Sequence, residues 1–203
     1  MVNKQNVAIF IFENVEVLDF AGPFEVFAVA RDADDQRLFN VYTVSMDGET
    51  LNARNGLSIN PTYSIETMPQ PDILVVPGGR GTRPLIGNDA IRSFIQSQQP
   101  KLNKLLSVCT GSLLLADAGV LNGLQATTYH TEIDHLTQID ASITTQAGER
   151  WVDNGQIVTS AGVSAGIDMS LYVVSQLFDQ ATADLTAQHM EYEHWPISNR
   201  TNN

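Results

Sequence analysis

The sequence contains a single cysteine, Cys109, among 203 residues, and this scarcity excludes an internal disulfide. A chain without disulfides is typical of a reducing compartment, so we expect a cytoplasmic protein. Long hydrophobic runs are missing as well, because no apolar stretch approaches the ~20 residues of a membrane-spanning helix. The polar segment 1–6 lacks the pattern of a signal peptide. These absences predict a protein with no membrane partner.

Positive charge is also scarce. The chain has 11 lysine and arginine residues against 23 aspartate and glutamate residues, and its formal net charge is -12. A protein that binds nucleic acid needs a basic surface to neutralise phosphates, so this balance argues against a nucleic-acid partner. The four histidines show no convincing metal-ligand spacing with carboxylates, and one cysteine cannot complete a thiolate site. We therefore expect no bound metal.

Short apolar strands alternate with helical patterns along the chain. The strands include uninterrupted apolar runs, which are typical of parallel strands covered by helices on both faces. Strands are predicted at residues 7–12, 39–45, 72–76, 105–108, 126–128, 150–152 and 156–160. Helices are predicted at residues 23–31, 88–99, 112–118, 131–136, 167–178 and 181–189. This alternation predicts one α/β domain over residues 1–203, with a doubly wound, flavodoxin-like, mostly parallel sheet and helices on both faces. Its core should span about residues 6–190, and a polar tail, 191–203, should lie on the surface.

Cys109 lies at a corner of this pattern, between the strand 105–108 and the helix 112–118. A strand, a sharp turn carrying a nucleophile and then a helix is the layout of a nucleophile elbow. Unpaired N–H groups at the start of a helix favour an anion, so we expect a reactive thiol with a lowered pKa. The alternative is a small buried hydrophobe, as most lone free cysteines are. The position at the corner favours the reactive thiol.

Asp19 lies in apolar surroundings before the helix expected to begin at Pro23. As a helix cap it would need no further function, since aspartate is favoured there. However, the loops that follow parallel strands meet at one edge of the sheet, which would bring Asp19 near Cys109. A thiolate would disfavour the charged form of the carboxyl group. Asp19 is therefore a candidate general acid.

Two further loops should reach the same edge. Gly78 and Gly79 allow close approach of the backbone to a ligand, and the N–H groups of Gly79 and Thr110 are candidates for an anion hole. A plain turn after the strand is the alternative. The loop 161–166 carries Ser164, a candidate for substrate binding.

Two other polar residues near this edge have simpler interpretations. Asp168 could orient a group in the pocket, but a role in capping the helix and complementing its dipole is favoured. For His130 we favour a surface or capping role.

Five segments together resemble the ThiJ/PfpI superfamily, which shares the class I glutamine amidotransferase-like fold. They are residues 18–27, 76–79, 108–111, 126–128 and 160–168. The similarity covers the chain from residue 7 to about residue 196. It is strongest to the isonitrile hydratase (cyclohexyl-isocyanide hydratase) branch and to its relatives, the ligand-binding domains of AraC-type regulators.

The resemblance implies Cys109 as the nucleophile, Asp19 as its carboxylate partner and Thr110 as a neighbour in the site. It also implies a homodimer, an isocyanide-like small-molecule substrate and a hydro-lyase reaction that requires neither metal nor organic cofactor. Many relatives have His-Trp where this chain has Tyr129 and His130, and the usual family histidine would fall on Tyr129. This difference favours a Cys109–Asp19 pair over a Cys–His pair.

Two other functions remain open. The same pocket could belong to a non-catalytic small-molecule or redox sensor, as the similarity to regulator domains suggests. It could also belong to a glyoxalase or another thiol hydrolase, although the displaced histidine weighs against that alternative.

Overall fold

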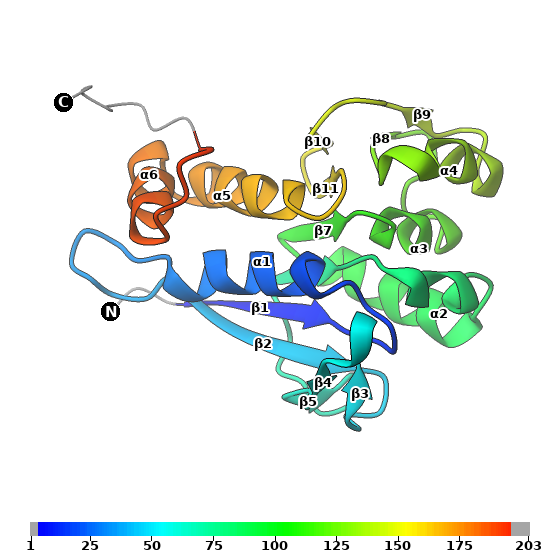
Figure 1. Cartoon of the computed structure of the whole chain (residues 1–203), viewed down its shortest axis with the longest axis horizontal. Helices are drawn as coiled ribbons and strands as arrows, with labels where there is room; N and C mark the ends of the chain where they lie inside the picture. Colours follow the sequence, from blue (N-terminus) through cyan, green and yellow to red (C-terminus); the bar gives the residue numbers. More distant parts are fainter. Residues whose placement is uncertain (1–3, 196–203) are drawn as a thin grey trace.

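A seven-stranded sheet forms the centre of the computed structural model, which describes residues 4–195 (Figure 1). Its strand order is β10-β11-β7-β6-β1-β2-β5. The strands are β1 (Gln5–Phe10), β2 (Phe39–Ser45), β5 (Tyr63–Ser64), β6 (Ile73–Val76), β7 (Lys104–Val108), β10 (Trp151–Asp153) and β11 (Ile157–Ser160). All neighbouring strands are parallel except the β10–β11 hairpin. The predicted doubly wound, mostly parallel sheet is confirmed. The tail residues 196–203 lie outside the described part of the chain.

Two groups of helices flank the sheet. The first comprises α1 (Val17–Val29), α5 (Ala165–Leu177) and α6 (Gln180–His189), which pack against one another. In the second, α3 (Gly111–Asp117) packs between α2 (Asp89–Gln98) and α4 (Ile133–Ile139). Short 3₁₀ turns η2 (Arg80–Leu85), η3 (Gln99–Lys101) and η4 (His130–Glu132) join these elements. The uninterrupted apolar strands are buried because helices cover the sheet.

Two small ribbons extend from the central sheet. Strands β3 (Leu51–Asn52) and β4 (Ser58–Ile59) form an antiparallel pair around the 3₁₀ turn η1 (Arg54–Gly56). The Arg54 N–H donates to the Val15 carbonyl at 2.9 Å, which attaches the ribbon to the loop after β1. Strands β8 (Gln125–Ala126) and β9 (Thr144–Thr145) form the second ribbon, with parallel pairing.

Helix α1 begins earlier than predicted. It starts at Val17, so Pro23 lies inside the helix instead of at its first position. Proline has no N–H to donate to the carbonyl four residues earlier, which here is that of Asp19. Burial of apolar residues, among them Val26 and Phe27, accompanies this irregularity. Asp19 is consequently in the first helical turn and not before the helix.

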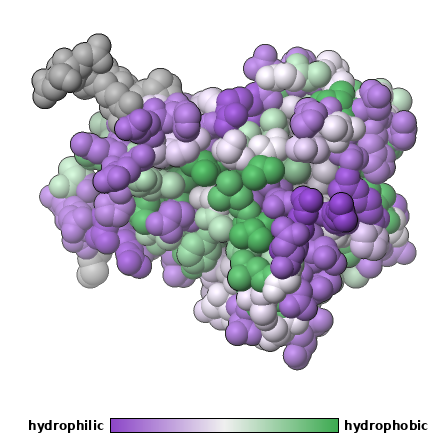
Figure 2. Space-filling model, viewed as in Figure 1, coloured by the Kyte–Doolittle hydropathy of each residue, from purple (hydrophilic) through white to green (hydrophobic). Residues whose placement is uncertain are grey.

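Apolar side chains gather near the middle of the face shown in Figure 2, and hydrophilic side chains surround them. Leu18 and Leu57 are among the large apolar residues that remain exposed, at 38% and 49% respectively. Within residues 4–195, none of the helices combines the length and the apolar character needed to cross a membrane.

Candidate active site

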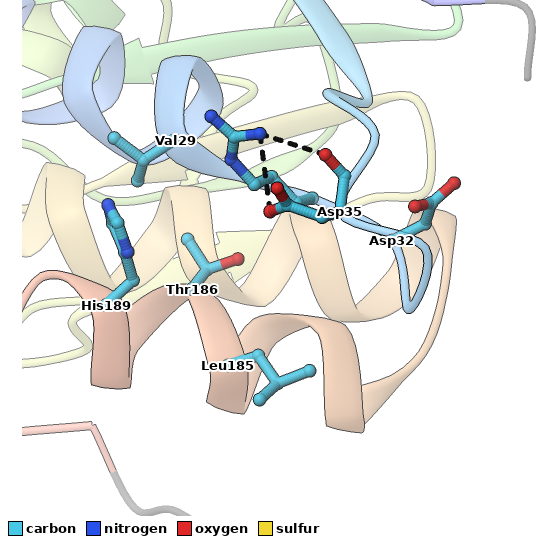
Figure 3. Close-up of a pocket in the computed structure, with 7 residues that line it drawn as sticks. Val29, Asp32, Asp35, Leu185, Thr186 and His189 are labelled. Atoms are coloured by element: carbon cyan, nitrogen blue, oxygen red, sulfur yellow. Dashed lines mark hydrogen bonds and ion pairs between the residues drawn. The ribbon is translucent and has the colours of Figure 1, made fainter.

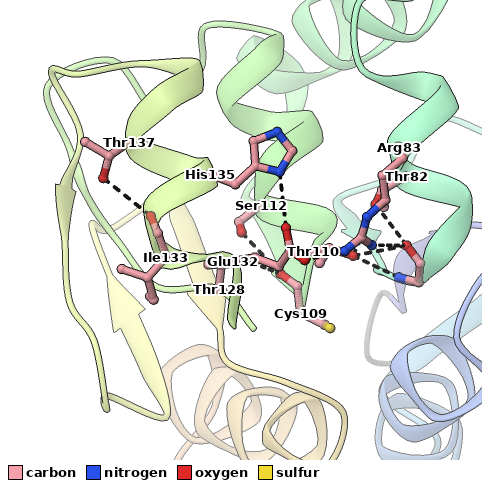
Figure 4. Close-up of polar contacts among 11 residues, drawn as sticks. Thr82, Arg83, Cys109, Thr110, Ser112, Thr128, Glu132, Ile133, His135 and Thr137 are labelled. Carbon is pink, nitrogen blue, oxygen red and sulfur yellow. Dashed lines mark hydrogen bonds and ion pairs between the residues drawn. The ribbon is translucent and has the colours of Figure 1, made fainter. Parts of the chain in front are cut away.

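Cys109 follows β7 directly and precedes α3, as expected for a nucleophile elbow. Its φ of 56° lies in the left-handed region, which is uncommon for a residue with a side chain and typical of strained functional turns. Hydrogen bonds at both the carbonyl and the N–H of Cys109 fix its backbone. The Cys109 carbonyl accepts from the hydroxyls of Ser112 and Thr128 at 3.1 and 3.0 Å, and its N–H donates to the carbonyls of Ser160 and Ala161. Figure 4 shows the thiol pointing away from Ser112 and Thr128.

The side chain of Asp19 is completely buried beside this elbow. Its Oδ2 accepts from the N–H of Gly78 at 3.1 Å, whereas Oδ1 has no partner with hydrogen-bond geometry among the described residues. Burial raises the pKa of Asp19 from 3.8 to about 7, against the lowering effects of the Gly78 N–H and the Cys109 thiol. The charge of Glu16 raises it further. The charged form is disfavoured as expected, but burial is the main cause and not the neighbouring thiol.

The lowered pKa expected for Cys109 is contradicted. Burial and, second, the charge of Asp19 raise the pKa of the thiol from 9.0 to about 12. The backbone N–H groups of Thr110 and Val163 hydrogen-bond the sulfur and lower the pKa, but they do not offset this rise. Between about pH 7 and about pH 12 the Asp19–Cys109 pair therefore holds one proton.

The glycines after β6 position the side chains of this pair. The N–H of Gly78 binds Asp19, and the N–H of Gly79 donates to Thr110 Oγ1 at 2.9 Å. A Cβ added at Gly78 would lie 2.5 Å from the Thr110 nitrogen and 2.9 Å from Asp19 Oδ2. The proposed anion hole needs correction, because the N–H of Gly79 is already engaged. The N–H of Thr110 does face the reactive atom, since it bonds the sulfur.

The loop after β11 contributes a backbone group that the sequence interpretation missed. Val163 has a φ of 48°, a conformation that is rare for a β-branched residue, and its N–H bonds the sulfur of Cys109. The loop itself was expected at this edge of the sheet, but no sequence signal distinguishes Val163 within it. Strain at this residue accompanies the placement of an N–H group at the nucleophile.

The structure places the side chain of Ser164 outside the lining of the cavity at Cys109. Its side chain is exposed at the start of α5, where it accepts from Arg150 Nη2 at 3.5 Å. The carboxylate of Asp168 pairs with Arg150 and accepts from the Tyr192 hydroxyl at 2.9 Å, so its bonds differ from those of a helix cap. Neither Ser164 nor Asp168 lines the cavity at Cys109. Helix α5 turns both residues toward Arg150 instead.

A cavity of about 240 Å³ opens beside Cys109. It is lined by Glu16, Arg54, Gly79, Arg80, Arg83, Cys109, Thr110, Tyr129, Thr131, Glu132 and Val163. Arg54 Nη1 contacts Glu16 Oε2 at 2.7 Å, and Arg83 pairs with Glu132 while donating to the Gly79 carbonyl at 3.1 Å. The sequence interpretation missed all three arginines. Arg80 and Arg83 follow Gly79 closely in the chain, which is a usable signal, but nothing local indicates Arg54.

Tyr129, the residue at which the resemblance would place the family histidine, lines the cavity. A Cβ at Gly162 would lie 2.4 Å from the Tyr129 ring, so the ring packs directly on the glycine backbone. His130 is exposed, its ring lies 4.3 Å from that of Tyr129, and it does not line the cavity. Cys109 therefore faces a carboxyl partner and not an imidazole within the described residues.

A second cavity of about 180 Å³ lies between the end of α1, the following loop and α6 (Figure 3). Arg31 and Asp35 form an ion pair at 3.3 Å there, and the Thr186 hydroxyl donates to the Thr182 carbonyl at 2.7 Å. It offers no thiol, because the only cysteine lies in the first cavity. Within residues 4–195, no group of three or more histidine, cysteine or acidic residues could hold a metal ion. The cavity at Cys109 is accordingly the candidate active site.

Comparison with known proteins agrees with this architecture. The DJ-1/PfpI family model matches residues 5–176. The chain is 34% identical to isonitrile hydratase from Pseudomonas putida over 190 residues, which cover 94% of this chain and 79% of that protein. It is 25% identical to the HTH-type transcriptional regulator GbdR from Pseudomonas aeruginosa, of which it spans only 52%. A ThiJ/PfpI family protein from Pseudomonas syringae superposes with a TM-score of 0.84 at 27% identity, over 100% of this chain and 80% of that one. The chain belongs to the DJ-1/PfpI family.

Proposed function

We propose that the protein is an isonitrile hydratase-like hydro-lyase that adds water to an isocyanide and releases an N-substituted formamide. The observation that carries the proposal is the buried Asp19–Cys109 pair, in which burial raises both pKa values. One proton shared by a nucleophile and a carboxyl group suits a reaction that must add a proton to carbon. The 34% identity to isonitrile hydratase supports the same assignment.

In the first half of the reaction, the thiol proton moves to Asp19 as the sulfur attacks the terminal carbon of R–NC. Asp19 then delivers this proton to the same carbon. The product is a thioimidate in which the CH carbon is bonded to Cys109 Sγ and doubly bonded to nitrogen. The N–H groups of Thr110 and Val163, which bond the sulfur, stabilise negative charge on it as the proton leaves.

In the second half, water adds across the carbon–nitrogen double bond. Asp19 accepts a proton from the water and passes it to the nitrogen, while the water oxygen, which keeps its second proton, bonds to carbon. The carbon–sulfur bond then breaks as the hydroxyl oxygen loses its proton to the Asp19–Cys109 pair, which releases R–NH–CHO. The pKa of about 7 suits both steps, because a group that titrates near neutrality can accept and donate a proton at physiological pH.

The test is incubation of the purified protein with cyclohexyl isocyanide and a panel of other isocyanides, with detection of formamide products. We expect N-cyclohexylformamide from the natural chain and none from Cys109→Ala. Turnover by the natural chain no faster than by Cys109→Ala across the whole panel would refute the proposal.

The two alternative functions have less support. Oxidation by peroxide proceeds through the thiolate, and the raised pKa of Cys109 makes this form scarce at neutral pH. A small-molecule sensor without turnover retains the support of the 25% identity to GbdR. A glyoxalase-type reaction that uses a Cys–His pair has no histidine among the residues lining the cavity. We also propose that the protein forms a homodimer, as its resemblance to family members implies.

A further inference from the structure

Charge is distributed unevenly between the cavity and the rest of the chain. Three of the 11 lysine and arginine residues, Arg54, Arg80 and Arg83, line the cavity at Cys109. Glu16 and Glu132 are the acidic residues of its lining, so these five side chains carry one net positive charge. The whole chain has a formal net charge of -12. The mouth of the cavity is therefore more positive than the rest of the chain, which favours negative charge in its ligand.

The three arginines are not equivalent. Arg54 is held by Glu16 at 2.7 Å, and Arg83 is held by Glu132 and the Gly79 carbonyl. Arg80 is exposed, and its guanidinium makes no ion pair or side-chain hydrogen bond within residues 4–195. Its planar donor groups are thus available, and they match a carboxylate in geometry and charge.

Apolar contacts in the cavity are few. Val163 is the aliphatic residue of the lining, and Tyr129 is the aromatic one. Pockets that bind hydrocarbon groups are lined predominantly by apolar side chains, with only a few polar groups. A cyclohexyl substituent would leave most of this lining unused. The volume of about 240 Å³ further limits the ligand to a small molecule.

We infer that the substrate carries a carboxylate, which Arg80 binds while the electrophilic carbon meets Cys109. The inference rests on the proposed function for the identity of that electrophile, an isocyanide bearing a short acidic substituent. Glu16 and Glu132 offset the charges of Arg54 and Arg83, so Arg80 supplies both the unpaired positive charge and the direct contact. Arg80 is a specificity-determining residue for the charge of the substrate.

The recognition of charge can be tested without any turnover. Iodoacetate and iodoacetamide are nearly the same size and alkylate the same thiol, but only iodoacetate carries a carboxylate. The experiment compares the ratio of the two alkylation rates at Cys109 between the natural chain and Arg80→Gln. Arg80→Lys serves as the charge-conserving variant. Arg37→Gln removes an exposed arginine outside the cavity lining and controls for the change in net charge.

The ratio of iodoacetate to iodoacetamide rates should fall about tenfold in Arg80→Gln, because a charge-assisted contact is lost. We expect Arg80→Lys to retain most of the preference and Arg37→Gln to retain all of it. Equal ratios in the natural chain and in Arg80→Gln would overturn the inference. So would an equal fall in Arg37→Gln, because that result would indicate the net charge of the protein and not a site.

Turnover provides the second measurement. Isocyanoacetate and its methyl ester share the isocyanide group and differ in the charge of the substituent. The inference predicts a higher kcat/KM for isocyanoacetate, and a loss of this preference of about tenfold in Arg80→Gln. Turnover of both compounds without a preference for the acid would overturn the inference and leave the proposed function intact. If neither compound nor any other isocyanide is turned over, the proposed function fails, and the alkylation ratio still decides the recognition of the carboxylate.

Discussion

Asp19→Asn should remove most of the dependence of stability on pH between about pH 4 and pH 7. The pKa of Asp19 is raised from 3.8 to about 7 in the folded protein. Below pH 3.8 the carboxyl group is protonated in both the folded and the unfolded chain. As the pH rises toward 7, the unfolded chain loses this proton first, so the free energy of unfolding of the natural chain decreases. Above about pH 7 both states are ionised and the effect of this group is constant.

The size of the effect follows from the shift. A rise from 3.8 to about 7 is about 3 pH units, and each unit corresponds to about 1.4 kcal/mol. Stability lost through Asp19 is therefore about 4 kcal/mol in total, of which about 2 to 3 kcal/mol falls between pH 5 and pH 7. The asparagine oxygen can still accept from the Gly78 N–H. Burial of the amide nitrogen of this asparagine has a cost that is independent of pH, so it does not alter the slope of the free energy of unfolding against pH.

Urea unfolding of the natural chain and of Asp19→Asn, at half-unit steps from pH 5 to pH 8, measures this difference. The variant should gain about 2 to 3 kcal/mol relative to the natural chain by pH 7 and little more beyond it. Glu25→Gln changes an exposed carboxylate of the same helix and should follow the natural chain. Parallel curves for the natural chain and Asp19→Asn would refute the reasoning, because they would mean that Asp19 titrates alike in both states.

Three further predictions concern Gly78, the thiol of Cys109 and the oligomeric state. Gly78→Ala should lower the free energy of unfolding, measured in urea, by at least about 2 kcal/mol, because its Cβ would lie 2.5 Å from the Thr110 nitrogen. The control Gly56→Ala has no atom within 4 Å of its Cβ and is strained only by its φ of 86°, so it should cost about 1 kcal/mol. The rate at which iodoacetamide alkylates Cys109, monitored by mass spectrometry, should increase steadily up to pH 10. Asp19→Asn should react faster than the natural chain at pH 8, because the substitution removes a negative charge beside the thiol. A plateau of the rate near pH 7 in the natural chain would contradict the raised pKa of Cys109. Light scattering at micromolar concentration should give twice the 22.2 kDa chain mass, and a monomer would refute the proposed dimer.

Elements with local signals could be predicted from the sequence. The strand predicted at 39–45 coincides with β2. The helix predicted at 88–99 corresponds to α2, which Asn88 caps with a side chain that accepts from the N–H groups of Ala90 and Ile91. Helix α1 was harder, because Pro23 indicates a helix start when only its neighbours are considered. The tertiary packing of α1 on the sheet decides where that helix begins, and no local pattern contains this packing.

The residues of the site also fall into those with a local sequence signal and those without one. Cys109 and Asp19 could be found because a strand, a corner and a helix have a recognisable order and because parallel strands end at one edge. Arg54 comes from a ribbon 38 residues beyond its partner Glu16, and no local pattern joins them. The pKa of Cys109 was predicted in the wrong direction because the sequence indicates the helix start but not the depth of burial or the ionised carboxyl beside the thiol.

The raised pKa values of Asp19 and Cys109 have one physical origin, and that origin bears on the proposed reaction. Both side chains are taken out of water by the packing of α1 against the sheet and the elbow, so each charge is costly and a second charge beside it is costlier. Such a pair resists losing its last proton, yet that proton can move between sulfur and oxygen without changing the net charge of the site. In the proposed reaction the sulfur attacks an uncharged carbon and the proton moves to the same carbon. The site therefore carries a single negative charge both before and after this step. The reaction thus proceeds without creating the second buried charge that makes the free thiolate scarce.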